Sequence, residues 1–119
     1  MNPEAFISIV KQVVELNSMD NVIKNITQLS GAKVDHRYKY LVEWYKDLDD
    51  EGRECVKQII REAVSTTLFG FFCVLDGVRA IENGPDKGRL ELYYVKENEK
   101  ILLNDFNEEF LHDIYKSME

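Results

Sequence analysis

The feature that most constrains the fold is an apolar block in the middle of the chain. Residues 64–78 read Val-Ser-Thr-Thr-Leu-Phe-Gly-Phe-Phe-Cys-Val-Leu-Asp-Gly-Val. Apolar residues at helical spacing lead into this block from Val56, and Asp76-Gly77 is a typical helix stop. The pattern predicts one long helix that is amphipathic in its first half and apolar on nearly every face in its second half. Such a helix would pass from the surface through the centre of a single core.

Chain length and composition indicate one folded domain. The chain has 119 residues, of which 45% are hydrophobic and 11% aromatic. Domains usually contain about 100 to 200 residues, and a disordered chain would have far fewer aromatic and branched aliphatic side chains. We therefore expect a single domain over residues 1–119.

Periodic apolar residues predict three helices before the long one. The first covers about residues 3–17, behind the cap and first-turn proline of Asn2-Pro3. Polar residues 17–20 are expected to interrupt it, and a short second helix continues to Ser30-Gly31. A third helix is expected over about residues 34–47.

The C-terminal third predicts a β-hairpin and a last helix. Residues 89–96 alternate with period two and are rich in β-forming side chains, and residues 100–104 follow after a short turn. Asn107 and the two glutamates after it are expected to open the last helix. The sequence therefore predicts an α+β fold: a mainly helical domain of about five helices, with the hairpin packed on the long central helix.

Net charge restricts the partners. Twenty-two acidic residues against 15 basic ones give a formal charge of −7, which repels phosphate backbones and anionic membranes. A basic protein would instead be attracted. We expect a basic protein partner, no direct nucleic-acid binding and no membrane association, in a monomer or a homodimer.

The cysteines and the chain start indicate a cytoplasmic protein. Cys55 and Cys73 are 18 positions apart with no partner at metal-ligand spacing, so both are expected to be free thiols. The start Met-Asn-Pro-Glu has no basic region or apolar signal core. The longest apolar stretch, Leu68–Leu75, is far shorter than the ~20 residues that cross a bilayer.

Sequence patterns do not identify an enzyme. We find no phosphate-binding glycine loop, His-Glu-x-x-His, Cys-x-x-Cys or Gly-x-Ser-x-Gly pattern, so no catalytic residue, metal or cofactor is predicted. An enzymatic or small-molecule-binding domain remains an alternative. It would use Asp76, Glu82 and His112 around a pocket between the hairpin and the long helix.

Acidic and aromatic residues are the best binding candidates. Asp47, Asp49 and Asp50 form an acidic run that can cap the long helix or meet a basic partner. Tyr40 falls outside the apolar stripe of its helix, and Tyr93 points away from the leucine face of its strand. These five residues form the predicted partner-binding set. Trp44 and Tyr45, by contrast, are expected to fill the core.

Several C-terminal segments carry a resemblance. They are Leu68–Val78, Ala80-Ile-Glu82, Leu90-Glu-Leu-Tyr-Tyr94, Leu102-Leu-Asn-Asp105 and Leu111-His-Asp-Ile-Tyr115. Together they resemble small bacterial proteins of the polymorphic-toxin immunity kind. The resemblance implies a cytoplasmic protein that binds and blocks a cognate toxin without catalysis.

Composition and resemblance together predict a small acidic binding protein that inhibits a protein partner. A second alternative is a structural or regulatory subunit that dimerises through the edge of the hairpin.

Overall fold

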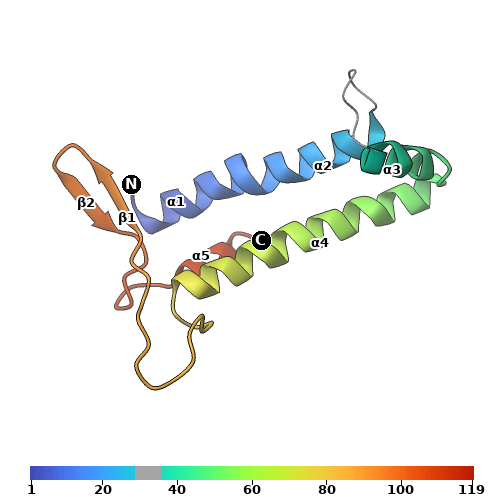
Figure 1. Cartoon of the computed structure of the whole chain (residues 1–119). Coiled ribbons are helices and arrows are strands. Elements are labelled where there is room, and N and C mark those ends of the chain that lie inside the picture. Colours follow the sequence, from blue (N-terminus) through green and yellow to red (C-terminus); the bar gives the residue numbers. More distant parts are fainter. Residues whose placement is uncertain (29–35) are drawn as a thin grey trace. The chain divides into compact units, whose positions relative to one another are not determined.

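The structure, a computed structural model, describes residues 1–28 and 36–119. It is mainly helical, with a long central helix and a two-stranded hairpin in the C-terminal part, which confirms the predicted α+β class (Figure 1). The elements are α1 (Pro3–Val10), the π-helix η1 (Lys11–Leu16), α2 (Asn17–Thr27), α3 (His36–Lys46), α4 (Asp50–Leu75), β1 (Tyr93–Lys96), β2 (Glu99–Leu102) and α5 (Leu111–Ser117).

Contacts divide the chain into two compact units. Unit 1 contains Met1–Val14 and Thr66–Glu119, and unit 2 contains Glu15–Ser65. The N-terminal helical run and α4 each contribute residues to both units. Independent folding of the whole chain as one domain stays a prediction.

The N-terminal helical run is longer than the sequence pattern indicates. Asn2 caps it, because its side-chain oxygen accepts a hydrogen bond of 2.8 Å from Ala5 N. The predicted break at residues 17–20 is wrong, since α2 begins at Asn17 directly after η1. That segment contains no glycine or proline, and Asn17 and Asp20 are exposed to water. Polar residues on a wet helix face interrupt the apolar pattern without ending the helix.

The core of unit 1 forms where α1, the second half of α4 and α5 meet. Its buried cluster comprises Ile7, Phe72, Leu111, Ile114 and Tyr115. The rings of Phe72 and Tyr115 pack with their centroids 5.3 Å apart. The apolar block thus contributes to the core of unit 1, but only Gly70, Phe72 and Cys73 of α4 are buried and Phe71 is 56% exposed, so burial on nearly every face is not observed.

The C-terminal end of α4 matches its predicted stop. Gly77 adopts a φ of +76°, and Val78 N donates to Cys73 O over 3.0 Å. This is the left-handed turn with which glycine commonly ends a helix. The Arg79 guanidinium lies over Gly70, inside α4.

The start of α5 differs from the prediction. The helix begins at Leu111 rather than at the acidic pair Glu108 and Glu109. Asp76 supplies the cap from 35 positions away, since its oxygens accept from Leu111 N at 3.0 Å and His112 N at 2.8 Å. No local pattern contains that contact, which explains the error.

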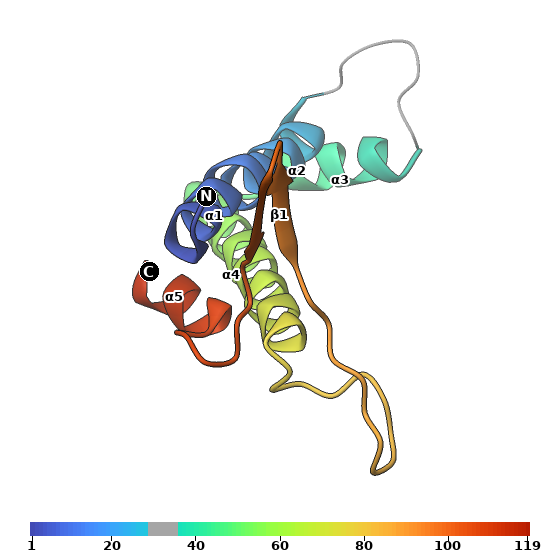
Figure 2. The same ribbon diagram turned by 90° about the vertical axis from the view of Figure 1, so that its left-hand side faces the viewer.

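The hairpin is antiparallel, with Tyr93 paired to Leu102 and Lys96 to Glu99. Figure 2 shows the long loop after α4 leading into β1. The turn lies at residues 97–98, where Glu97 has a positive φ of 53°. The base of the hairpin is held by Asn104, which is 4% exposed. Its amide nitrogen donates to Leu75 O at the end of α4 and to Leu90 O, and its oxygen accepts from Leu92 N. One side chain thus joins the hairpin to the central helix.

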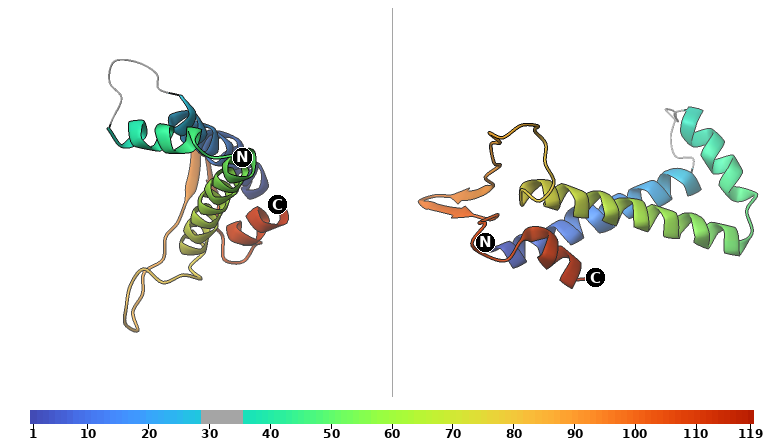
Figure 3. Two further views of the ribbon diagram at one scale, coloured as in Figure 1. Left: turned by 90° about the vertical axis from the view of Figure 1, so that its right-hand side faces the viewer. Right: turned by 90° about the horizontal axis from the view of Figure 1, so that it is seen from below.

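Unit 2 is built from α2, α3 and the first half of α4, with α3 packed beside α2 (Figure 3). Ile26, Val42 and Tyr45 are its buried apolar side chains. Arg53 of α4 donates to Lys46 O over 2.8 Å, and its guanidinium lies 5.7 Å from the centre of the Tyr45 ring. These contacts hold the end of α3 against the start of α4.

Helix α4 also has the length and composition of a membrane-spanning helix. Among the described residues it alone passes that test, with 26 residues and a mean hydropathy of 1.3 in its most apolar window. A core helix of a water-soluble protein passes the same test, so cytoplasmic localisation stays a prediction.

Candidate functional site

The structure separates the predicted binding residues into two groups. Tyr40, Asp47, Asp49 and Asp50 belong to unit 2, whereas Tyr93 lies on β1 of unit 1. The sequence-based proposal of one surface containing all five therefore stays a prediction. The four residues of unit 2 define the candidate site.

One face of α3 carries an exposed row of alternating aromatic and acidic side chains. Tyr40, Glu43, Trp44 and Asp47 are spaced by three, one and three positions, so they lie along one side of the helix and its first following residue. Tyr40 is 70% exposed and Trp44 46%, and both acids are also exposed. We call these four residues the α3 face.

The opposite side of α3 anchors the helix. Val42 is 1% exposed and Tyr45 is 7% exposed. At 100° per residue these two positions lie on the far side of the helix from Tyr40. Packing therefore fixes the rotation of α3 and directs the α3 face towards water.

Trp44 corrects one prediction and extends the site. It was expected in the core with Tyr45, and only Tyr45 is buried. Sequence reasoning also did not select Glu43. The signal that could have found both was their spacing from Tyr40, since positions three and four residues along share its side of a helix.

The acids near the α3 face have different structural roles. Asp49 caps α4, because its Oδ1 accepts a 2.7 Å hydrogen bond from Gly52 N. Asp50 is fully exposed and lies 3.7 Å from the Arg53 guanidinium. Asp47 is exposed at the end of α3. Asp49 thus stabilises the start of α4, whereas Glu43, Asp47 and Asp50 can be altered without removing this cap.

The local charge is negative. Residues 43–51 contain five carboxylates and one lysine. Arg37, Lys39 and Lys46 of α3 offset part of this charge. A partner with clustered positive charge would gain attraction chiefly at the C-terminal end of the α3 face.

Tyr93 lies in a polar setting on the hairpin. Its hydroxyl donates to Glu91 Oε2 over 3.2 Å, and the Lys100 ammonium lies 4.4 Å from the centre of its ring. The hydrogen bond to Glu91 raises the pKa of the Tyr93 hydroxyl above its ordinary value. The ring is 39% exposed, so Tyr93 is held by neighbours and only partly available to a partner.

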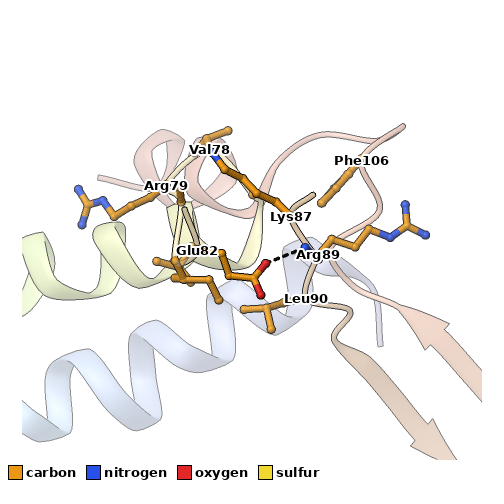
Figure 4. A pocket seen from close by; sticks show the side chains of 12 residues that line it. Val78, Arg79, Glu82, Lys87, Arg89, Leu90 and Phe106 are labelled. Atoms are coloured by element: carbon orange, nitrogen blue, oxygen red, sulfur yellow. Dashed lines mark hydrogen bonds between the residues drawn. The ribbon is translucent and has the colours of Figure 1, made fainter. Parts of the chain in front are cut away.

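The residues of the enzymatic alternative do not converge on one pocket. Asp76 and His112 pair, with His112 Nδ1 2.6 Å from Asp76 Oδ2. Glu82 instead accepts from Gly88 N over 2.7 Å in the loop after α4 (Figure 4). In residues 1–28 and 36–119, no group of three His, Cys, Asp or Glu side chains is placed to hold a metal ion.

Buried polar atoms are satisfied throughout the described residues, where each buried side-chain nitrogen or oxygen has a hydrogen-bond partner. An unsatisfied buried group is often a mark of an internal site. In the described residues, no buried polar group of this kind indicates an internal site.

No family model matches the chain, and no curated protein or solved structure matches it either.

Proposed function

We propose that this chain is a protein-binding module that inhibits a basic protein by covering its functional surface with the α3 face. The observation that carries the proposal is the exposure of Tyr40 and Trp44 side by side among carboxylates. Tyrosine and tryptophan dominate binding hot spots because they bury a large area with few rotatable bonds.

Charge supports the choice of partner. The whole chain has a formal charge of −7, and the end of the α3 face is its most concentrated acidic segment in unit 2. Complementary charge accelerates encounter with a basic protein and weakens as salt is added. A nuclease-like toxin, whose substrate is a polyanion, would present such a basic surface.

The segments that resemble toxin-immunity proteins support the same proposal through the fold of unit 1. They contain core residues such as Phe72, Leu111 and Tyr115, together with Asp76 and Asn104, which join elements of unit 1. The resemblance therefore concerns residues that stabilise the fold, while the α3 face lies outside it. In this proposal unit 1 is scaffold and unit 2 provides the contact.

The test uses the full-length tagged chain and lysate of its source cell, at low and moderate salt. The site variant is Glu43→Lys with Asp47→Lys, which leaves the Asp49 cap intact. The control is Glu97→Lys with Glu99→Lys on the hairpin, which makes the same change of net charge at exposed positions. Circular dichroism checks that both variants keep the helical content of the wild type.

The proposal predicts one stoichiometric basic protein, identified by mass spectrometry, that the wild type and the hairpin variant retain and the α3 variant loses. Equal retention by both variants would show that the partner binds elsewhere. Equal loss by both would show that only net charge matters, which would also exclude a specific α3 interface.

A further inference from the structure

The loop between α4 and β1 borders a half-open hollow of about 600 Å³ in unit 1, whose lining residues are exposed to water apart from the half-buried Val74 (Figure 4). This volume falls within the range of small-molecule sites, about 300 to 1,000 Å³. The walls come from the last turn of α4, from the loop and from Phe106 after the hairpin. The hollow lies wholly within unit 1 and involves no residue of the α3 face.

Apolar side chains form most of its wall. They are Val74, Val78, Ala80, Ile81, Leu90 and Phe106. Val78 is 53% exposed and Ile81 63%, which is unusual for large aliphatic side chains gathered in one place. The loop therefore holds apolar surface in contact with water that an apolar ligand would cover.

A hydrogen bond within the loop links its two sides. Glu82 Oε2 accepts from Gly88 N across the loop, and Gly84 makes the turn between them with a φ of +105°. On the other side, Asn104 ties Leu90 O to the end of α4. These contacts hold the loop around the hollow, which is open to water.

The charge around the hollow is opposite to that of the whole chain. Its lining includes Arg79, Lys87 and Arg89 but one carboxylate, Glu82. Figure 4 shows the Lys87 side chain extended across the hollow, while the guanidinium groups of Arg79 and Arg89 point away on opposite sides. Lys87 is thus the cation placed to meet a bound group, whereas the Arg79 guanidinium lies over Gly70 of α4 and the Arg89 guanidinium lies 3.5 Å from Glu91 Oε2.

From the apolar wall and the single cation across it, we infer that this hollow binds a small amphipathic anion, such as a carboxylate with an aliphatic chain. The chain of the ligand covers Ile81, Leu90 and Phe106, and its carboxylate pairs with the Lys87 ammonium. The inference is independent of the α3 face, so either can fail without the other.

The test titrates the full-length protein, labelled with ¹⁵N, with decanoate and with decyltrimethylammonium as a cation of the same chain length. We expect saturable one-to-one binding of decanoate, with the largest amide shifts in residues 77–90 and at Phe106. Lys87→Glu should weaken decanoate binding about 10-fold or more, the scale of one charge-assisted hydrogen bond. Lys96→Glu, an exposed position on β1 outside the hollow, makes the same charge change and should leave the affinity unaltered.

Several results would overturn the inference. They are absence of saturable decanoate binding, shifts centred outside the loop, and equal binding of decyltrimethylammonium. Unchanged affinity in Lys87→Glu would also overturn it. Because Lys87 and Lys96 are exposed, neither variant removes a core contact, and the amide spectrum itself confirms that each remains folded.

Discussion

Asp76 is a buried carboxylate that joins two distant parts of unit 1. Its oxygens accept three hydrogen bonds from α5, namely from Leu111 N, His112 N and the His112 ring. Since hydrogen bonds to a charged group contribute about 1.5–3 kcal/mol each and act here as one network, Asp76→Ala should destabilise unit 1 by about 2–4 kcal/mol.

Urea unfolding followed by circular dichroism, with amide exchange of α5, measures this loss. Glu109→Ala, at an exposed position before α5, is the control and should change stability by less than about 0.5 kcal/mol. A similar stability for Asp76→Ala and wild type would contradict the assigned role of Asp76.

The two thiols should differ in reactivity. Cys55 is exposed, whereas Cys73 is buried and its pKa is raised, chiefly because burial disfavours the thiolate. Since the thiolate is the reactive form, a disulfide reagent at pH 8 should modify Cys55 at least about 10-fold faster than Cys73. In Cys55→Ser the fast phase should disappear and only the slow reaction of Cys73 should remain. Two equal rates in the wild type would show that Cys73 is accessible to the reagent.

Burial of the Cys73 thiol also determines how the stability of the fold changes with pH. The folded state favours the neutral thiol of Cys73, so its contribution to stability is complete below the ordinary thiol pKa. It is lost as the pH rises through the raised pKa of the folded state. In Cys73→Ala this part of the alkaline loss of stability should disappear.

At the scale of elements, the end of α4 depends on one glycine. Gly77 has a φ of +76°, and an added Cβ would lie 3.2 Å from Phe106 Cζ. Gly77→Ala should therefore cost about 1–2 kcal/mol, the penalty of a left-handed conformation for an L-residue.

Gly70→Ala is the matched comparison for Gly77→Ala. Its Cβ would meet the flexible end of Arg79, which can move, and alanine favours a helix by up to about 1 kcal/mol over glycine. Gly70→Ala should have a higher melting temperature than Gly77→Ala in thermal unfolding. The reverse order would mean that the Arg79 contact, rather than the turn, holds this end of the helix.

Local signals determined which elements could be predicted. The stop of α4 at Asp76-Gly77 and the presence of a hairpin follow from neighbouring residues, and both are confirmed. The strands are shorter than the predicted residues 89–96 and 100–104, since they cover Tyr93–Lys96 and Glu99–Leu102. The beginning of α5 depends on Asp76, and the base of the hairpin depends on Asn104. Both contacts join residues about 30 positions apart, which periodicity does not reveal.

The candidate site was predictable in part for a similar reason. Tyr40 was identified because it falls outside the apolar stripe, and its exposure confirms that inference. Trp44 was assigned to the core because it lines up with Leu41, Tyr45 and Leu48 at helical spacing, although its spacing of four from Tyr40 also places it next to that exposed residue. Helical spacing alone did not show which edge of this apolar stripe faces water.

At the scale of the whole molecule, the proposal assigns binding to unit 2 and a scaffold role to unit 1. Trp44 is the single tryptophan of the chain, so its fluorescence reports the α3 face alone. Because Glu43 and Asp47 lie on the same side of α3 as Trp44, a cationic quencher such as caesium should quench the free chain more efficiently than iodide. Stronger quenching by iodide would contradict an acidic setting for Trp44.

The most direct test of the central claim is acrylamide quenching of Trp44, before and after addition of the captured partner. To keep the signal specific, the partner is prepared with a non-fluorescent tryptophan analogue. The account predicts efficient quenching in the free chain and strong protection in the stoichiometric complex. A complex in which Trp44 stays as accessible as in the free chain would show that the α3 face is not the interface.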